Sequence, residues 1–132
     1  MKLDHIGIAV SNLDEANALF QEILGSAPYK EEEVEGEKVI TSFFSAGESK
    51  VELLVSSDPN GAIGRFIEKR GPGIHHIAFE VENIREKMDY YAQKGYRLLN
   101  EEPKKGADNK LIAFLHPKDT SGVLIELCED VS

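Results

Sequence analysis

GPGIHHIAFEV, at residues 71–81, repeats the beginning of the chain and thereby defines the expected architecture. Residues 3–10 read LDHIGIAV, and the two stretches align without a gap. Identical residues coincide as follows: His5 with His76, Ile6 with Ile77, Val10 with Val81 and Asn12 with Asn83. A chain that restarts halfway along its length is expected to contain two copies of one module.

The periodicity of apolar residues predicts the same order of elements, βαβββ, in both halves. The first half is expected to have a strand at 3–10, a helix that ends at Gly25, a connection or edge strand at 28–36, and a hairpin of strands at 39–44 and 50–55. A short helix is expected in the joint at 58–73. The second half is expected to have a strand at 74–81, a helix at about 83–94, a short apolar segment at 96–99, a polar loop at 101–109, and hairpin strands at 111–116 and 123–127.

Two modules are too few for a repeat array, so we expect them to pair and to share one sheet surface. The whole chain, residues 1–132, would then form a single domain. Within it, module one would span about residues 2–57, the joint about 58–72, and module two about 73–130.

The composition is that of a soluble globular protein with an acidic surface. Among 132 residues, 24 Asp and Glu outnumber 15 Lys and Arg, which gives a formal net charge of -9. This charge disfavours a nucleic-acid partner, because phosphate backbones attract basic proteins. No apolar run approaches the length of a membrane span, no signal peptide is recognisable, and the lone Cys128 suits a reducing compartment. We therefore expect a cytoplasmic protein whose partners include neither a membrane nor a nucleic acid.

Two histidines and two glutamates occupy matched positions in the two halves. His5 and His76 share strand faces with small residues, while Glu52 and Glu126 lie within the apolar sequences VELL and LIEL. A carboxylate on a buried face is costly unless it is paired or binds a cation. A single strand histidine is more often structural, but here both residue types recur. The recurrence predicts an octahedral or five-coordinate divalent metal site with the ligands His5, Glu52, His76 and Glu126.

Three other residues are candidates for the same site. His75 aligns with Asp4 on the helix-facing side, which favours a structural or supporting role. His116 ends a strand and would either line the cavity mouth or form part of a turn. Cys128 shares a face with Glu126, and no sequence neighbour marks it as a nucleophile.

The motifs around the four predicted ligands resemble one known superfamily. They are DHIGIAV with His5, SKVELL with Glu52, GPGIHHIAFEV with His76 and FLHPKDTSGVLIEL with Glu126. Over essentially its full length the chain is similar to the vicinal oxygen chelate superfamily, and the double histidine and HPKDTSGVLIEL are most similar to the methylmalonyl-CoA epimerase family. The resemblance implies an α+β fold in which two paired βαβββ modules form a curved mixed β-sheet around a metal site, with helices on its outer face.

The resemblance also implies a reaction, a cofactor and partners. The reaction interconverts (2R)- and (2S)-methylmalonyl-CoA by removing and returning the proton next to the thioester, with the help of a divalent metal ion. Co2+ is favoured, and Mn2+, Ni2+ or Zn2+ would also suit these ligands. Glu126 is the expected catalytic base on one face of the substrate. The implied partners are an acyl-CoA substrate and a second copy of the chain in a homodimer.

The second catalytic base is unassigned. Some relatives carry a glutamate where this chain has Thr41, and a threonine hydroxyl is not a useful base. Glu37 and Glu52 are the remaining candidates. The phosphates of coenzyme A are expected near the loop lysines Lys104, Lys105 and Lys118.

Two alternative functions stay open. The order H…E…H…E also occurs in glyoxalase I, so a glyoxalase I-type metalloenzyme is the first. The fold also serves in antibiotic-sequestering resistance proteins, so a small-molecule-binding module without catalysis is the second. Such modules tend to lose the metal ligands, which this chain retains.

Overall fold

The computed structural model describes every residue, Met1–Ser132, and the chain divides into two compact units. One unit comprises His5–His75, and the other comprises Met1–Asp4 with His76–Ser132. No helix is both long enough and apolar enough to cross a membrane.

The unit of His5–His75 is built on strands in the order β2-β3-β4-β1. Its strands are β1 (Lys2–Ala9, which begins in the other unit), β2 (Lys30–Val34), β3 (Val39–Ala46) and β4 (Ser49–Ser56). β1 runs parallel to β4, and the other neighbouring strands are antiparallel. The pairing of β1 with β4 is regular, so the two residues of each pair project to the same face of the sheet along the whole contact.

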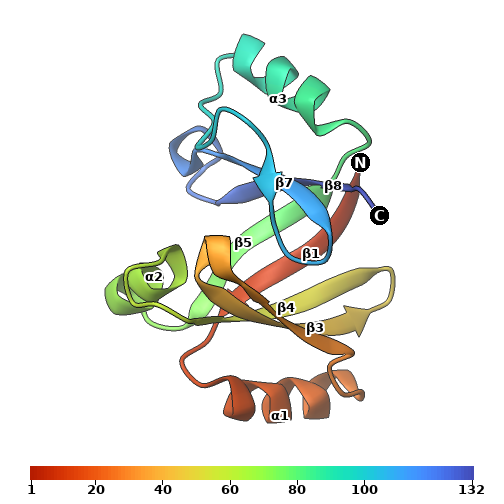
Figure 1. Cartoon of the computed structure of the whole chain (residues 1–132), viewed down its shortest axis with the longest axis vertical. Helices are drawn as coiled ribbons and strands as arrows, with labels where there is room; N and C mark the ends of the chain where they lie inside the picture. The colour runs from red at the N-terminus through yellow and green to blue at the C-terminus, as the bar shows by residue number, and fades with distance from the viewer. The chain divides into compact units, whose positions relative to one another are not determined.

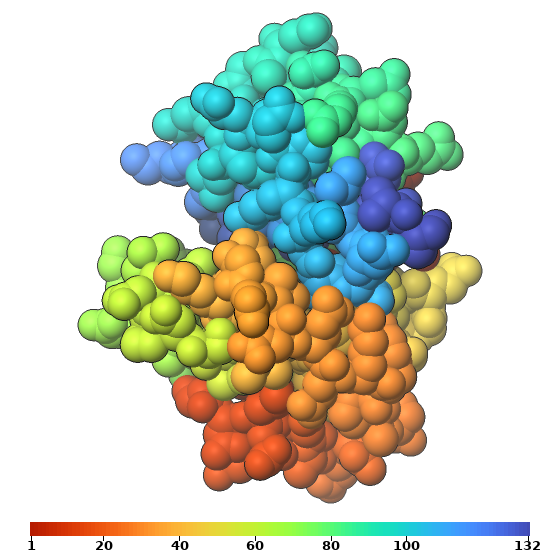
Figure 2. All heavy atoms as spheres, in the orientation of Figure 1, coloured from red at the N-terminus to blue at the C-terminus, as the bar shows by residue number.

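Helix α1 (Leu13–Leu24) covers one face of this sheet, as Figure 1 shows. Glu15 N donates to the side chain of Asn12 at 3.0 Å, and Gly25 ends the helix with φ 81°. In Figure 2 the red-orange atoms of α1 lie directly against the orange atoms of the strands above them. The buried residues of this contact are Val10, Ala16, Phe44 and Leu53.

Helix α2 (Ala62–Arg70) packs against the opposite face of the same sheet. Its buried partners include Leu54, which lies on the same side of β4 as Glu52 because side chains alternate along a strand. The buried residues of the cluster are Ala9, Val39, Leu54 and Ile63. α2 therefore closes one end of the face that carries His5 and Glu52.

The second unit repeats this plan with strands in the order β5-β8-β7-β6. Its elements are β5 (Gly73–Glu80, which begins in the first unit), α3 (Ile84–Gln93), β6 (Lys104–Lys105), β7 (Lys110–Leu115) and β8 (Ile125–Asp130). Asn83 caps α3 by accepting from Glu86 N at 3.1 Å, as Asn12 caps α1. The core under α3 contains Val81, Ile84, Met88, Ala113 and Leu127.

The predicted order βαβββ is confirmed in both halves, with one correction of position. The polar segment at 101–109, predicted as a loop, contains the short strand β6 (Lys104–Lys105), which pairs with β7. Gly106 N donates to Lys110 O at 2.9 Å and closes this turn. In the apolar segment at 96–99, Leu98 makes only an isolated bridge to Leu115. Backbone pairing to β7, rather than hydrophobicity, determined which segment became the strand.

Candidate metal and active site

The first candidate site pair is His5 with Glu52. His5 Nδ1 lies 3.1 Å from Glu52 Oε2, and the two residues are only 4% and 5% exposed. β1 and β4 produce the pair, because their register places Glu52 opposite Gly7, two residues beyond His5. The glycine leaves room on this face for the two longer side chains.

The second candidate site pair is His76 with Glu126, in the other unit. His76 Nε2 lies 3.2 Å from Glu126 Oε1, and both residues are buried. The register of β5 and β8 places Glu126 opposite Ala78, again two residues beyond the histidine. The internal repeat of the sequence is therefore also a repeat of strand register and of side-chain contact.

A phenylalanine borders each glutamate on the next strand. Phe43 of β3 lies opposite Glu52, and Phe114 of β7 lies opposite Glu126. The ring of His76 meets Phe114 edge to face, with centroids 6.1 Å apart. Phe43 is fully buried. Each ring places apolar surface beside one polar pair, which raises the cost of leaving the carboxylate without a cation or a donor.

Each unit supplies a pair of donor atoms of the kind that binds a divalent metal ion. Each unit supplies one imidazole nitrogen and one carboxylate oxygen, held 3.1 and 3.2 Å apart. Neighbouring ligands of an octahedral ion with bonds of about 2.1 Å are about 3.0 Å apart, so each pair already has ligand-like spacing. Nitrogen and oxygen donors without thiolate suit a first-row divalent ion.

The other predicted site residues have different surroundings. Thr41 is buried on β3, where it lies opposite Glu32 and Leu54, and Glu37 belongs to a single 3-10 turn between β2 and β3. Neither observation assigns a second base. Lys118 lies in the 3-10 turn Pro117–Asp119.

His75, His116 and Cys128 have structural contacts. The ring of His75 meets Phe66 of α2 edge to face at 5.0 Å, and burial lowers its pKa to about 4. His116 Nδ1 accepts a hydrogen bond from Lys118 N at 3.1 Å, which supports its interpretation as a turn residue. Cys128 is fully buried, and burial is the main reason that the pKa of its thiol is raised. A protonated, buried thiol is a poor nucleophile.

Arg97 anchors the HPKDTSG turn through a contact that was not predicted from the sequence. The guanidinium of Arg97 donates to Asp119 twice, from Nε at 3.1 Å and from a terminal nitrogen at 2.9 Å. Arg97 N also donates to Asp119, at 2.8 Å. These bonds lower the pKa of Asp119 to about 2. The two residues are 22 positions apart, so no local sequence pattern predicts the contact.

A second contact that the sequence analysis missed lies beside the first strand. Lys110 is buried, and its Nζ lies 3.3 Å from Asp4 Oδ1 and 3.6 Å from Glu80 Oε1. Burial alone would lower the pKa of Lys110, but the negative charge of Asp4 and its neighbours outweighs burial and raises that pKa. Asp4 directly precedes His5, so this ion pair holds the strand that carries the first predicted ligand.

A match to a protein-family model identifies the superfamily of the chain. A family model described as the Glyoxalase/Bleomycin resistance protein/Dioxygenase superfamily matches residues 4–114, and the chain belongs to this family. This membership agrees with the predicted α+β fold of two βαβββ modules and with the observed order of elements.

Two similar proteins indicate which branch of this superfamily the chain resembles. The chain is 41% identical over 128 residues to the uncharacterized protein YqjC of Bacillus subtilis, covering 97% of this chain and 91% of that protein. It is 39% identical over 127 residues to the mitochondrial methylmalonyl-CoA epimerase of Homo sapiens, covering 96% of this chain and 72% of that protein.

A solved structure confirms the fold over the full chain. It is a variant of Streptomyces coelicolor methylmalonyl-CoA epimerase in complex with 2-nitronate-propionyl-CoA. The similarity has a TM-score of 0.94 at 32% identity and covers 100% of this chain and 99% of that one.

Proposed function

We propose that this protein is a methylmalonyl-CoA epimerase, an isomerase that interconverts the (2R) and (2S) forms of methylmalonyl-CoA. The similarity to the mitochondrial epimerase of Homo sapiens and to the epimerase of Streptomyces coelicolor supports this choice of substrate. The observation that carries the chemistry is the recurrence of one buried histidine–glutamate pair in each unit, His5–Glu52 and His76–Glu126.

The residues that would hold the metal are His5, Glu52, His76 and Glu126. Their donor atoms are the nitrogens and oxygens that cobalt, manganese, nickel and zinc accept, and we favour cobalt. When bound, a divalent ion supplies Lewis acidity that stabilises negative charge developing on the thioester oxygen. Both carboxylates would then be neutralised by a cation, which removes the cost of burying them.

Glu126 is the proposed base for one face of the substrate. Its carboxylate is held against His76 and bordered by Phe114, so its position is defined and bulk water is excluded. Inversion requires a proton to leave one face and another to arrive at the opposite face, hence a second group with hydrogen-bond reach. Glu52 and Glu37 are the proposed candidates, because the hydroxyl of Thr41 is not a useful base.

A deuterium wash-in experiment tests the function. The protein is freed of metal, reloaded with Co2+, and mixed with (2R)-methylmalonyl-CoA in deuterated water. We expect metal-dependent inversion accompanied by deuterium at the carbon between the thioester and the carboxylate. The same experiment is performed on Glu126→Gln, which removes the proposed base. Glu82→Gln, which changes an exposed glutamate, is its control.

Absence of both inversion and exchange in a fully metallated sample would reject the epimerase. A glutathione hemithioacetal, tested in parallel, reports the glyoxalase I alternative. The homodimer is also part of this proposal, and sedimentation of the metal-loaded protein tests it directly.

A further inference from the structure

The outer edge of β7 is only partly covered by a neighbouring strand. β6 pairs with two residues of β7, Lys104 with Ile112 and Lys105 with Leu111. Phe114 lies two residues beyond the last of these pairs, so β6 does not reach it. The backbone groups of Phe114 at this edge therefore need another partner, because unpaired N–H and C=O groups inside a protein are costly.

The side chain of Asn100 supplies that partner. Phe114 N donates to Asn100 Oδ1 at 3.0 Å. Asn100 Nδ2 donates to Glu102 O at 2.7 Å and to Ile112 O at 3.4 Å. The preceding residue completes the cover, since Leu99 N donates to Phe114 O at 2.8 Å. A carboxamide combines a carbonyl acceptor with N–H donors, as a peptide group does, so this side chain takes the place of a strand residue.

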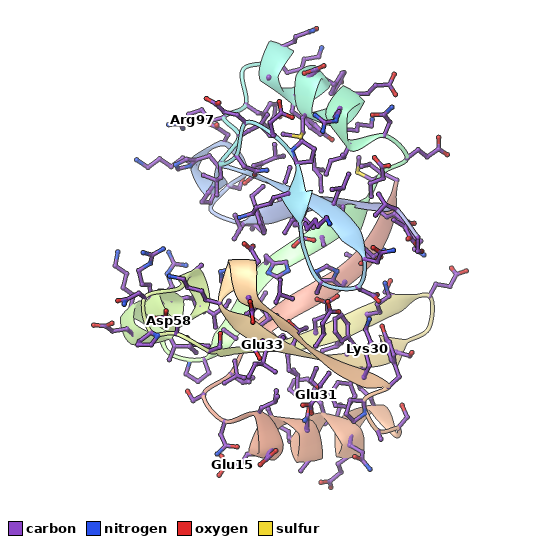
Figure 3. All side chains as sticks on the ribbon, in the orientation of Figure 1. Glu15, Lys30, Glu31, Glu33, Asp58 and Arg97 are labelled. Carbon is purple, nitrogen blue, oxygen red and sulfur yellow. The ribbon has the colours of Figure 1, made fainter.

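The first unit shows what Asn100 replaces. There Tyr29 N donates to Phe43 O at 2.8 Å, which is the same contact at the same distance. The next residue, Lys30, labelled in Figure 3, begins β2 and pairs directly with Phe43. In the second unit, Leu99 is followed instead by Asn100, and the edge strand begins only with β6.

A lysine of the edge strand lies over each phenylalanine ring, which indicates that the two edges correspond. Lys30 Nζ lies 4.9 Å from the ring centroid of Phe43, and Lys104 Nζ lies 5.8 Å from that of Phe114. Lys30 pairs with Phe43 itself, however, whereas Lys104 pairs with Ile112. The edge strand of the second unit is thus displaced by two residues along β7, and this displacement leaves the gap at Phe114.

Phe114 contacts the histidine of the predicted ligand pair in its own unit. Its ring meets His76 edge to face, with centroids 6.1 Å apart and an interplanar angle of 88°, and its backbone pairs with Glu126. Phe114 is only partly buried, at the margin of a small core cluster, whereas Phe43 is fully buried. Packing therefore restrains the Phe114 ring less, and the backbone bonds to residues 99 and 100 matter more for its position.

We infer that Asn100 is a positioning residue for the His76–Glu126 pair. Its side chain fixes the backbone of Phe114, and the ring of Phe114 holds the imidazole of His76 in the orientation that directs a nitrogen toward Glu126. Replacing a residue that orients a metal ligand from behind commonly costs about 10–100-fold in metal affinity. The inference rests on the proposed function, in which His76 and Glu126 hold the metal ion.

Cobalt binding by Asn100→Leu tests the inference. Leucine has a similar branched shape but lacks the acceptor and both donors. We expect the dissociation constant for Co2+ to rise about tenfold and the visible absorption spectrum of bound Co2+ to change, because the imidazole is no longer held in orientation.

Asn83→Leu is the matched control in the same unit. It removes the hydrogen bond from Glu86 N, at 3.1 Å, that caps α3. Loss of a cap destabilises the fold, so this variant should melt at a lower temperature than the wild type. It should nevertheless bind Co2+ with the wild-type affinity and spectrum, since α3 supplies no residue of the pair.

Two further variants test the route through Phe114. Asn100→Asp keeps the oxygen that accepts from Phe114 N, so it should recover most of the Co2+ affinity that Asn100→Leu loses. Phe114→Leu removes the ring and should itself weaken Co2+ binding. Adding Asn100→Leu to Phe114→Leu should then cause no further loss, because the ring is the link between Asn100 and His76.

The inference is overturned if Asn100→Leu binds Co2+ with the affinity and spectrum of Asn83→Leu, or if its full effect persists without the Phe114 ring. Should Asn100→Leu fail to fold, wild-type Co2+ binding by Phe114→Leu would overturn it instead. These results leave the epimerase intact when the wild-type protein inverts its substrate. Conversely, a wild-type protein that binds Co2+ without inversion or exchange would reject the proposed function, and the loss of Co2+ affinity in Asn100→Leu would still sustain the positioning role.

Discussion

Lys110 and Asp4 form a buried ion pair, with 3.3 Å between Nζ and Oδ1, although 106 positions separate them in the chain. Their side chains are only 6% and 1% exposed. Removing one partner leaves the other charge buried without compensation, which is the costly way to break such a pair.

The first prediction is that Lys110→Met lowers the free energy of unfolding by about 3 kcal/mol. The exposed Lys105→Met should stay within about 0.5 kcal/mol of the wild type. Urea unfolding followed by circular dichroism measures both. The double variant Asp4→Asn with Lys110→Met should recover part of the loss, because it removes the orphaned charge. A single variant as stable as Lys105→Met would contradict the ion pair.

The second prediction concerns acid stability and the Arg97–Asp119 contact. The pKa of Asp119 is lowered to about 2 from 3.8, so the unfolded chain binds the proton more tightly than the folded protein. The contact therefore stabilises the fold above pH 3.8, and that contribution is lost as the pH falls through about 2.

Melting curves recorded at about pH 5 and at several lower pH values down to about 2 test the second prediction. Arg97→Met should melt at a lower temperature at pH 5 and show a shallower fall in melting temperature below pH 4 than the wild type does. Arg85→Met, which removes an exposed partner of Glu102, is the control. Parallel acid profiles for the wild type and Arg97→Met would show that Asp119 is not responsible.

The third prediction concerns a glycine inside a helix. Alanine normally stabilises a helix interior relative to glycine by about 1 kcal/mol. In α2, a Cβ on Gly64 would lie 2.8 Å from Cα of Pro59 and 2.7 Å from its carbonyl oxygen. The backbone would have to shift, so Gly64→Ala should instead destabilise the protein by about 1–3 kcal/mol.

Gly36→Ala is the matched control for Gly64→Ala, because a Cβ there would meet nothing within 4 Å. Thermal unfolding of both variants measures the difference. Stabilisation by Gly64→Ala would mean that α2 does not dock closely on the segment that precedes it.

The fourth prediction is that metal binding and stability depend on the two histidine–glutamate pairs. Glu126→Gln should weaken affinity for Co2+ at least about tenfold, since losing even a supporting partner of a ligand has that effect. Removing the metal with a chelator should lower the melting temperature, and reloading should restore it. Metal titration and calorimetry measure these effects, with Glu82→Gln as the control. Equal affinity in both variants would exclude Glu126 as a ligand.

Local sequence signals predicted those features that neighbouring residues determine. The alignment of His5 with His76 predicted two modules, and the structure has the same order of elements in each. Asn12 and Asn83 each precede an amphipathic segment, and both cap a helix. The side-chain period of a strand is two, so it was sufficient to place Glu52 and Glu126 on the faces of the histidines.

Strand register determined the contacts that local sequence patterns could not predict. It placed Glu52 opposite the residue two positions after His5. Lys104, predicted to lie in a loop, instead belongs to an edge strand and lies over the ring of Phe114. The ion pair of Asp4 with Lys110 likewise depends on chain segments that are distant in sequence.

By itself, then, the sequence determined the repeated module, the helix ends and the identity of the predicted ligands, because these depend on residues within a few positions of one another. Only the tertiary structure decided which side chains meet, since backbone pairing between distant strands sets their register. The buried charges and the two lysines over aromatic rings are consequences of that pairing.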